Sequence, residues 1–340
     1  MPELPILPTT VVGSHAKPGW WHHCKGLADT GEWGQADLDE LLSDAVDIAI
    51  LDQERAGIDI ITDGESRRLD GYVDGFYDIV RGIRAVPPQR KAGPWGYDQQ
   101  TRYEAVDKIN VPEYGLGIVA EFEYLKAHTK KATKVACPGP LTFGSRIRPN
   151  QHYANTVAVA ERFADVINVE LRALVKAGAT FIQIDEPARG NVTGQEMARL
   201  FNMATEGVKA KLAFHICFGN RYGRSRFKRD YADYFPGALD ARADQFVLEF
   251  ASRFMGNLPQ WKGWSDGREL GAGIIDVKSF YPETPEDVAA RVREVLQYAD
   301  ADKVYLNPDC GFGWSPRYIA FAKLKALAEG AKLARKQLAG

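Results

Sequence analysis

Short apolar stretches rich in valine and isoleucine alternate with longer amphipathic stretches along the 340 residues of the chain. The apolar stretches are typical of buried strands, and the stretches between them repeat hydrophobic residues at helical spacing. The pattern predicts eight strands, over residues 5–14, 57–65, 133–139, 180–187, 212–219, 245–251, 270–277 and 304–311. It predicts helices near residues 37–56, 117–128, 155–177, 193–209 and 316–337.

The order of these elements indicates the fold class. Strands that are hydrophobic almost throughout, and joined by helices, are typical of parallel sheets covered on their faces by helices. Eight such units in one chain of this length fit an α/β fold of the TIM (β/α)8 barrel type better than an open doubly wound sheet. Residues 68–131 break the rhythm with several prolines and aromatic residues, which predicts an insertion after the second strand that lies over the barrel mouth. We expect one domain over residues 1–340, because no linker rich in glycine and serine divides the chain.

Composition excludes several classes of protein. The chain has 43 lysine and arginine residues against 45 aspartate and glutamate residues, and 45% of its residues are hydrophobic. This balance argues against a disordered or fibrous protein and against a nucleic-acid partner, which would require a basic face. No stretch approaches the roughly 18 apolar residues of a membrane span, and the N-terminus does not resemble a secretion signal, so we expect a cytoplasmic protein with no membrane partner. Four scattered cysteines do not suit a disulfide framework, which leaves metal binding or burial.

Polar side chains follow the predicted strands at their carboxyl ends, where a TIM barrel places its chemistry. Apolar strands that end in acids, thiols and an imidazole predict a polar mouth on a packed core. The residues concerned, in chain order, are Ser14, Asp63, Glu65, Asp185, Glu186, His215, Cys217, Glu249, Asp276, Lys278, Asp309 and Cys310.

Four of these residues form a candidate metal site. His215 and Cys217 are two residues apart in a predicted strand, so both side chains project from one face. Glu249 and Cys310 follow later strands and supply two further ligands. One imidazole, two thiolates and one carboxylate suit Zn²⁺ and exclude Mg²⁺ and Ca²⁺. The alternative is that the cysteines are small buried hydrophobes and the histidine a core residue, but their convergence on one barrel end favours a metal.

The charge of this ligand set indicates the kind of reaction. Three anionic ligands on a dication make a poor Lewis acid for carbonyl groups, but they suit the activation of a thiol. A thiol that binds the metal loses its proton and remains nucleophilic when the other ligands are electron-rich. Glu249, the most weakly held ligand, would leave its place to the incoming sulfur.

Several motifs resemble those of the cobalamin-independent methionine synthase family, in order and across nearly the whole chain. The resemblance is to the catalytic barrel of that family in a short, single-domain form. The motifs are TTVVGS at 9–14, DGE at 63–65, QIDEPA at 183–188, HIC at 215–217, the strand-end Glu249 and NPDCG at 307–311.

The resemblance implies a zinc-dependent transfer of a methyl group to the thiol of homocysteine, which forms methionine. It implies zinc ligands at His215, Cys217, Glu249 and Cys310. Homocysteine-binding positions carry over to Val12, Gly13, Ser14, Glu65 and Asp185. Acids at Glu65 and Asp185 suit an ammonium group, and Ser14 with nearby backbone N–H groups suits a carboxylate. The candidate catalytic residues are Asp185 and Lys278.

The chain also departs from the family pattern. It lacks the N-terminal half of the long enzymes, it has Lys278 where the family has a proton-donating histidine, and residues 144–150 lack the tryptophan that stacks on the folate. These departures argue against folate as the methyl donor and make a corrinoid donor, carried by a corrinoid protein, one candidate. Two alternatives stay open. One is a zinc enzyme that opens epoxides with the thiol of coenzyme M, with Lys278 or Tyr72 as the acid, and the other is a noncatalytic zinc barrel that binds a partner methyltransferase.

Overall fold

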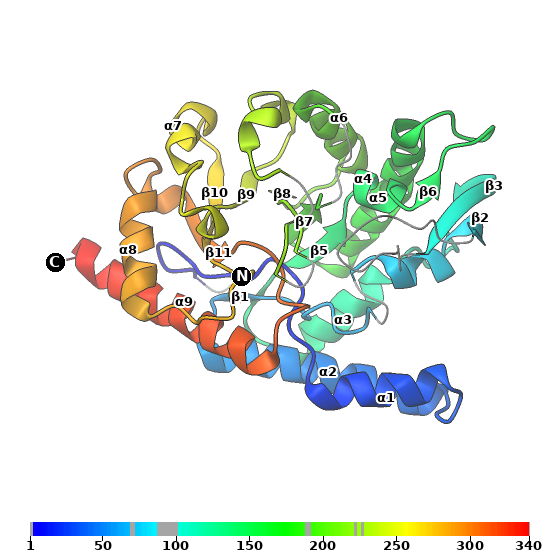
Figure 1. Cartoon of the computed structure of the whole chain (residues 1–340), viewed down its shortest axis with the longest axis horizontal. Coiled ribbons are helices and arrows are strands. Elements are labelled where there is room, and N and C mark those ends of the chain that lie inside the picture. The colour runs from blue at the N-terminus through cyan, green and yellow to red at the C-terminus, as the bar shows by residue number, and fades with distance from the viewer. Residues whose placement is uncertain are drawn as a thin grey trace.

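The strands form a closed ring of parallel neighbours in the middle of the molecule (Figure 1). The computed structural model describes residues 3–68, 72–86, 101–187, 192–220, 223–225 and 228–339. Six parallel strands lie in the order β11-β10-β9-β8-β7-β5, and β1 pairs with β4 just before β5. These strands span Ile60–Ile61 (β1), Ala132–Thr133 (β4), Val135–Pro138 (β5), Phe181–Asp185 (β7), Lys211–Ile216 (β8), Gln245–Glu249 (β9), Glu269–Ile275 (β10) and Val304–Pro308 (β11).

The N-terminal segment closes this ring. Thr9 bridges Leu306 of β11, and Thr10 bridges Ile60 of β1, both in the parallel sense. The backbone N–H of Thr10 donates to the carbonyl of Leu306 at 2.9 Å, and that of Ile60 donates to the carbonyl of Thr9 at 3.0 Å. β4 and β5 are separated by one residue and share one position, with β1 on one side and β7 on the other. The segment around Thr9 therefore takes the first place in an eight-membered ring within the described residues, as the sequence predicts for a (β/α)8 barrel.

Side chains from six neighbouring positions of the ring fill the inside of the barrel. They form a hydrophobic cluster separate from the larger core that packs between strands and helices. Its members are Val12, Ile60, Ala132, Phe181, Ala213 and Val247. Because side chains alternate along a strand, residues two and four positions further on face the same interior and approach the barrel mouth. This alternation carries His215 and Asp185 to the site described below.

Helices cover the outside of the ring (Figure 1). Their ends carry the expected capping signals: the side chain of Asn155 accepts from the backbone N–H of Ala158, and Gly178 ends the same helix in the left-handed conformation. Helix α8 begins with a capping box between Thr284 and Asp287. The helices span Gly19–Asp29 (α1), Gln35–Ala56 (α2), Ile118–His128 (α3), Pro140–Gly144 (α4), Thr156–Ala177 (α5), Gly194–Ala204 (α6), Trp261–Trp264 (α7), Pro285–Val295 (α8) and Arg317–Ala339 (α9).

The segment after β1 contains structure that does not belong to the ring. Strands β2 (Arg81–Val86) and β3 (Arg102–Asn110) form an antiparallel pair, and β3 also pairs with β6 (Ile147–Arg148). Helix α3 packs against α2 and α5, so it is the barrel helix between the second and third positions of the ring. Several residues on which the predicted insertion over 68–131 rests, namely Pro87, Pro88, Pro94 and Trp95, lie outside the described residues.

Short 3₁₀ helices occupy several of the remaining connections. They span Asp74–Asp78, Tyr231–Asp233, Gly237–Asp240, Ala251–Arg253, Leu258–Gln260 and Ala301–Lys303. Helix α6 ends at residue 204, five residues earlier than the pattern predicts, and the Thr205 hydroxyl donates to the carbonyl of Phe201 at its end. Among the described helices, none is both long enough and apolar enough to span a membrane.

Candidate active site and metal centre

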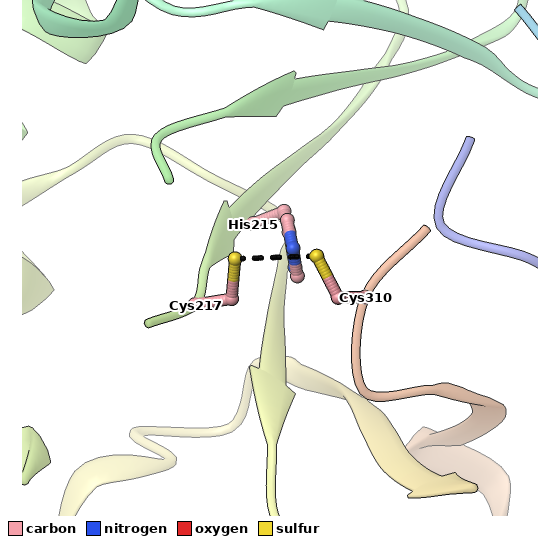
Figure 2. Close-up of side chains that lie close together, drawn as sticks. All are labelled: His215, Cys217 and Cys310. Atoms are coloured by element: carbon pink, nitrogen blue, oxygen red, sulfur yellow. Dashed lines mark hydrogen bonds between the residues drawn. The ribbon is translucent and has the colours of Figure 1, made fainter. Parts of the chain in front are cut away.

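Three of the four predicted metal ligands meet at the carboxyl end of the ring. His215 lies on β8, Cys217 follows the end of that strand, and Cys310 follows β11. Their ligand atoms all lie within 4.8 Å of one another, and the two sulfur atoms are 3.6 Å apart. Figure 2 shows the three side chains pointing toward one another. The structure thus brings together three residues that are distant in the sequence.

The hydrogen bonds of His215 suit a metal ligand. Its Nδ1 lies 3.0 Å from the carbonyl oxygen of Val247, which can only accept, so Nδ1 carries the proton. The other ring nitrogen, Nε2, is buried and has no hydrogen-bond partner among the described residues. A histidine that binds zinc has this arrangement, with one nitrogen bound to a carbonyl and the other free for the ion. The donor set of one imidazole and two thiols therefore fits Zn²⁺.

Glu249 does not join the three ligands, although it lies beside them. Its Oε1 is 2.8 Å from Nζ of Lys278, and the Ser252 hydroxyl donates to the same oxygen. Its Oε2 accepts from the backbone N–H of Phe218 at 3.3 Å. Both members of the ion pair are buried. Burial lowers the pKa of Lys278, but the charges of Glu249 and Cys310 outweigh this effect and raise it above its usual range.

The predicted substrate loop after the first strand touches the acid after the second. The Ser14 hydroxyl donates to Oε2 of Glu65, and Arg68 lies 3.0 Å from Oε1 of the same carboxylate. A Cβ atom at Gly13 would overlap the carboxylate of Glu65, so a larger residue here would displace that side chain. Burial raises the pKa of Glu65 to about 7, and the charge of Arg68 opposes that shift.

Asp185 completes the acidic side of the mouth. It ends β7 and lies next to His215 in the register of β7 and β8. Its Oδ1 accepts from Nε2 of Gln183 at 2.7 Å. Burial raises the pKa of the Asp185 carboxyl, while the nearby His215 and Lys134 and the hydrogen bond from Gln183 counteract this. The structure therefore places Ser14, Glu65 and Asp185 at the same end of the ring as the three metal ligands.

Two other acids at the strand ends support the backbone. Glu186 points away from Asp185 and accepts from the backbone N–H groups of Leu141 and Thr142, at the start of α4. Asp309 accepts from the backbone N–H groups of three consecutive residues after β9, from Phe250 to Ser252. Because both acids lie at a strand end, as Asp185 does, the sequence alone predicts them as site residues too. Their hydrogen bonds assign them to the loops instead.

Sequence reasoning missed a second group of charged residues at the mouth. Arg68 is buried and also pairs with Glu121 at 3.1 Å. Lys17 donates to the carbonyl of Glu65 at 2.8 Å, and burial lowers its pKa to about 8. The hydroxyl of Tyr72 is buried without a hydrogen-bond partner among the described residues. Arg68 and Lys17 follow strand ends at irregular distances, so no spacing rule identifies them, whereas the sequence already suggests Tyr72 as a candidate acid.

Comparison with known proteins decides the family. The model of the family described as cobalamin-independent synthase, catalytic domain, matches residues 7–333. The chain belongs to this family. A protein named methionine synthase from Thermococcus kodakarensis is 36% identical over 341 residues, which cover 99% of this chain and 96% of that protein. A methionine synthase from Saccharolobus solfataricus is also 36% identical, over 344 residues that cover 99% and 98%.

A solved structure of the family has the same architecture. It is described as a B12-independent methionine synthase from Shewanella sp. W3-18-1 in complex with selenomethionine. It superposes on this chain with a TM-score of 0.82 at 28% identity, and the match covers 98% of this chain and 99% of that one. The relatives and this chain are thus similar over their full lengths, which confirms the family resemblance found in the motifs and the TIM-barrel fold class.

Proposed function

We propose that the protein is a zinc-dependent methyltransferase that transfers a methyl group to the thiol of homocysteine and forms methionine. The observation that carries the proposal is the meeting of His215, Cys217 and Cys310 on the barrel end that also holds Ser14 and Asp185. A structural zinc site has no need of substrate-binding groups beside it. The names of the relatives, methionine synthase, agree with this function.

The residues divide the work between the two ends of the substrate. A zinc ion held by His215, Cys217 and Cys310 would supply a positive charge that keeps the substrate sulfur in its nucleophilic thiolate form. Glu249, beside this trio, is the proposed fourth ligand in the absence of substrate. Asp185 and Glu65 would bind the substrate ammonium, and the Ser14 hydroxyl and its neighbouring backbone would bind the carboxylate.

Lys278 bears directly on the identity of the methyl donor. Folate needs a proton on its departing nitrogen, whereas a corrinoid leaves without one. Lys278 stands where the family has its proton-donating histidine, but its ammonium is already held by Glu249 at 2.8 Å. This contact supports a corrinoid donor, free or carried by a corrinoid protein, over folate.

The experiment that tests the function identifies acceptor and donor together. Zinc-loaded protein is incubated with homocysteine or with coenzyme M, each against methylcobalamin, methyltetrahydrofolate and a simple epoxide, and the products are identified by mass spectrometry. We expect methionine from homocysteine and methylcobalamin. An adduct of coenzyme M with the epoxide, and no methionine, would replace this function with epoxide opening. No product with any pair, despite bound zinc, would favour a noncatalytic barrel.

A further inference from the structure

A chain of hydrogen bonds runs through the inside of the barrel, beneath the mouth. It begins at Lys134, between β4 and β5, whose side chain is completely buried. Nζ of Lys134 donates to Oε1 of Gln183 at 2.7 Å. Nε2 of Gln183 donates both to the carbonyl oxygen of Val12 and to Oδ1 of Asp185, each at 2.7 Å. This series of hydrogen bonds therefore ends on two residues of the proposed substrate site, Val12 and Asp185.

The chemistry of these groups allows only one orientation of the Gln183 amide. An ammonium group has only N–H donors, so Lys134 must face the amide oxygen. A carbonyl and a carboxylate oxygen only accept, so Val12 and Asp185 must face the amide NH₂ group, and they use both of its hydrogens. All three contacts require the same orientation of the amide. Burial lowers the pKa of Lys134 to about 7, against attraction by Asp185, but an uncharged amine still has an N–H for Oε1.

Burying a lysine costs free energy, so a buried lysine is expected to have a role in the fold or in the site. Burying a charged group removes it from water at a cost in free energy, and replacing buried charges by apolar groups is often neutral or stabilising. Stability alone therefore gives little reason for a lysine inside this barrel. Its partner Gln183 is also buried, and it lies two residues before Asp185, on the same face of β7.

We propose that Lys134 is a positioning residue that makes the site selective for thiols carrying an α-ammonium group. By holding the Gln183 amide in one orientation, it keeps Nε2 on Oδ1 of Asp185. The second carboxylate oxygen, Oδ2, then has a defined direction toward the substrate. Lys134 acts through Gln183 and has no contact with the reacting sulfur. This inference rests on the proposed function, because it takes Asp185 as the group that binds the ammonium.

The test compares two ligands that differ only in the ammonium group. Homocysteine and 4-mercaptobutyrate share the thiol, the chain length and the carboxylate. Calorimetric titration of zinc-loaded wild-type and Lys134→Met protein gives both dissociation constants. We expect the variant to bind homocysteine about tenfold more weakly, the value of one charge-assisted hydrogen bond, and to bind 4-mercaptobutyrate as the wild type does. Zinc content, measured separately, should not change.

Two further variants make the test specific. Gln183→Met should reproduce the effect, and the double variant should be no worse than either single one, because both break the same chain of contacts. The matched control is Lys211→Met. Nζ of Lys134 and Nζ of Lys211 both lie over the ring of Phe181, 5.6 and 4.8 Å from its centre. Lys211 is ion-paired with Glu269, however, and the amide oxygen of Gln183 accepts from Lys134. Lys211→Met should leave the ratio of the two affinities unchanged.

The other outcomes are equally informative. An equal loss for both ligands in Lys134→Met would mean general loosening of the site and would overturn the proposal, as would no loss for either. If Lys134→Met does not fold, Gln183→Met decides by the same ratio. If the wild-type protein itself does not bind homocysteine, the proposed function is overturned, and this inference with it. The wild-type titration alone shows that outcome.

Discussion

Lys278 and Glu249 form a buried ion pair, 2.8 Å between Nζ and Oε1, directly beside the three residues that form the candidate metal centre. A zinc ion bound at this centre would therefore compete with the ammonium of Lys278 for one carboxylate. If the metal leaves, Lys278 keeps Glu249 neutralised. If a substrate thiol takes the fourth position on the metal, the displaced carboxylate has a partner to receive it.

Removal of Lys278 should therefore matter most when no metal is bound. In metal-free protein, Lys278→Met leaves Glu249 buried without a countercharge, and we expect a loss of about 3 kcal/mol in the free energy of unfolding. With zinc bound, the dication supplies the charge, and the loss should be less than half as large. Denaturant unfolding with and without zinc measures both values.

The matched control for this experiment is Lys323→Met. Lys323 forms an equally buried ion pair with Glu283, at 2.7 Å, outside the metal trio. The loss in the free energy of unfolding that Lys323→Met causes should be the same with and without zinc. If zinc changed the cost of both variants alike, the relation between Lys278 and the metal would be refuted.

Zinc binding itself depends on the two thiols. We expect about one zinc per chain by elemental analysis, the stoichiometry of a single mononuclear site. The double variant Cys217→Ser, Cys310→Ser should lose it, because it removes both soft ligands and leaves His215. Cys24→Ser, which changes a free cysteine on α1, should keep it. Full zinc retention in the double variant would show that the site lies elsewhere.

Asp185 should be needed for the substrate and dispensable for the metal. Asp185→Asn keeps the size of the side chain and removes its charge, so homocysteine should bind roughly tenfold more weakly or worse. Glu186→Gln is the control, since the adjacent acid faces α4 and should leave homocysteine affinity unchanged. Calorimetry measures both affinities, and zinc content should be normal in both. Equal homocysteine affinity in Asp185→Asn and wild type would remove Asp185 from the site.

Glu65 should make the metal-free protein less stable as the pH rises. Its folded pKa of about 7 lies above the ordinary value of 4.5, so the folded state binds more protons than the unfolded state between these values. Stability from this group is complete below pH 4.5 and falls as the pH rises to about 7, by up to about 3 kcal/mol at 1.4 kcal/mol per unit. Glu65→Gln removes this dependence. Parallel pH profiles of unfolding for variant and wild type would contradict the prediction.

The pattern of the sequence predicted elements with local signals well. Helix α5 was predicted over 155–177 and spans Thr156–Ala177, because Asn155 caps its start and Gly178 ends it. The second strand was predicted over 57–65, but only Ile60–Ile61 pairs with a neighbour. Apolar sequence marks a buried segment, whereas the length of a strand depends on what lies beside it.

The site was predicted in the same uneven way. The spacing of His215 and Cys217 predicted both on one face of a strand, and these are two of the three residues of the candidate metal centre. The pairing of Glu249 with Lys278 joins residues from two neighbouring strand ends, which no local pattern contains. The contact between Lys134 and Gln183 was not predicted, because their side chains meet inside the barrel, where the pattern favours apolar residues.

The ring is closed by residues that lie far apart in the sequence, and this has a consequence for its synthesis. Thr9 leaves the ribosome long before its bridge partner Leu306 is made. The carbonyl of Ser14 likewise has no partner until Phe312 is made, because the backbone N–H of Phe312 donates to it at 2.8 Å. A nascent chain that still lacks β11 thus holds an open barrel with two unpaired edges. It also lacks Cys310, so the candidate metal site is incomplete until the last strand of the ring has been made.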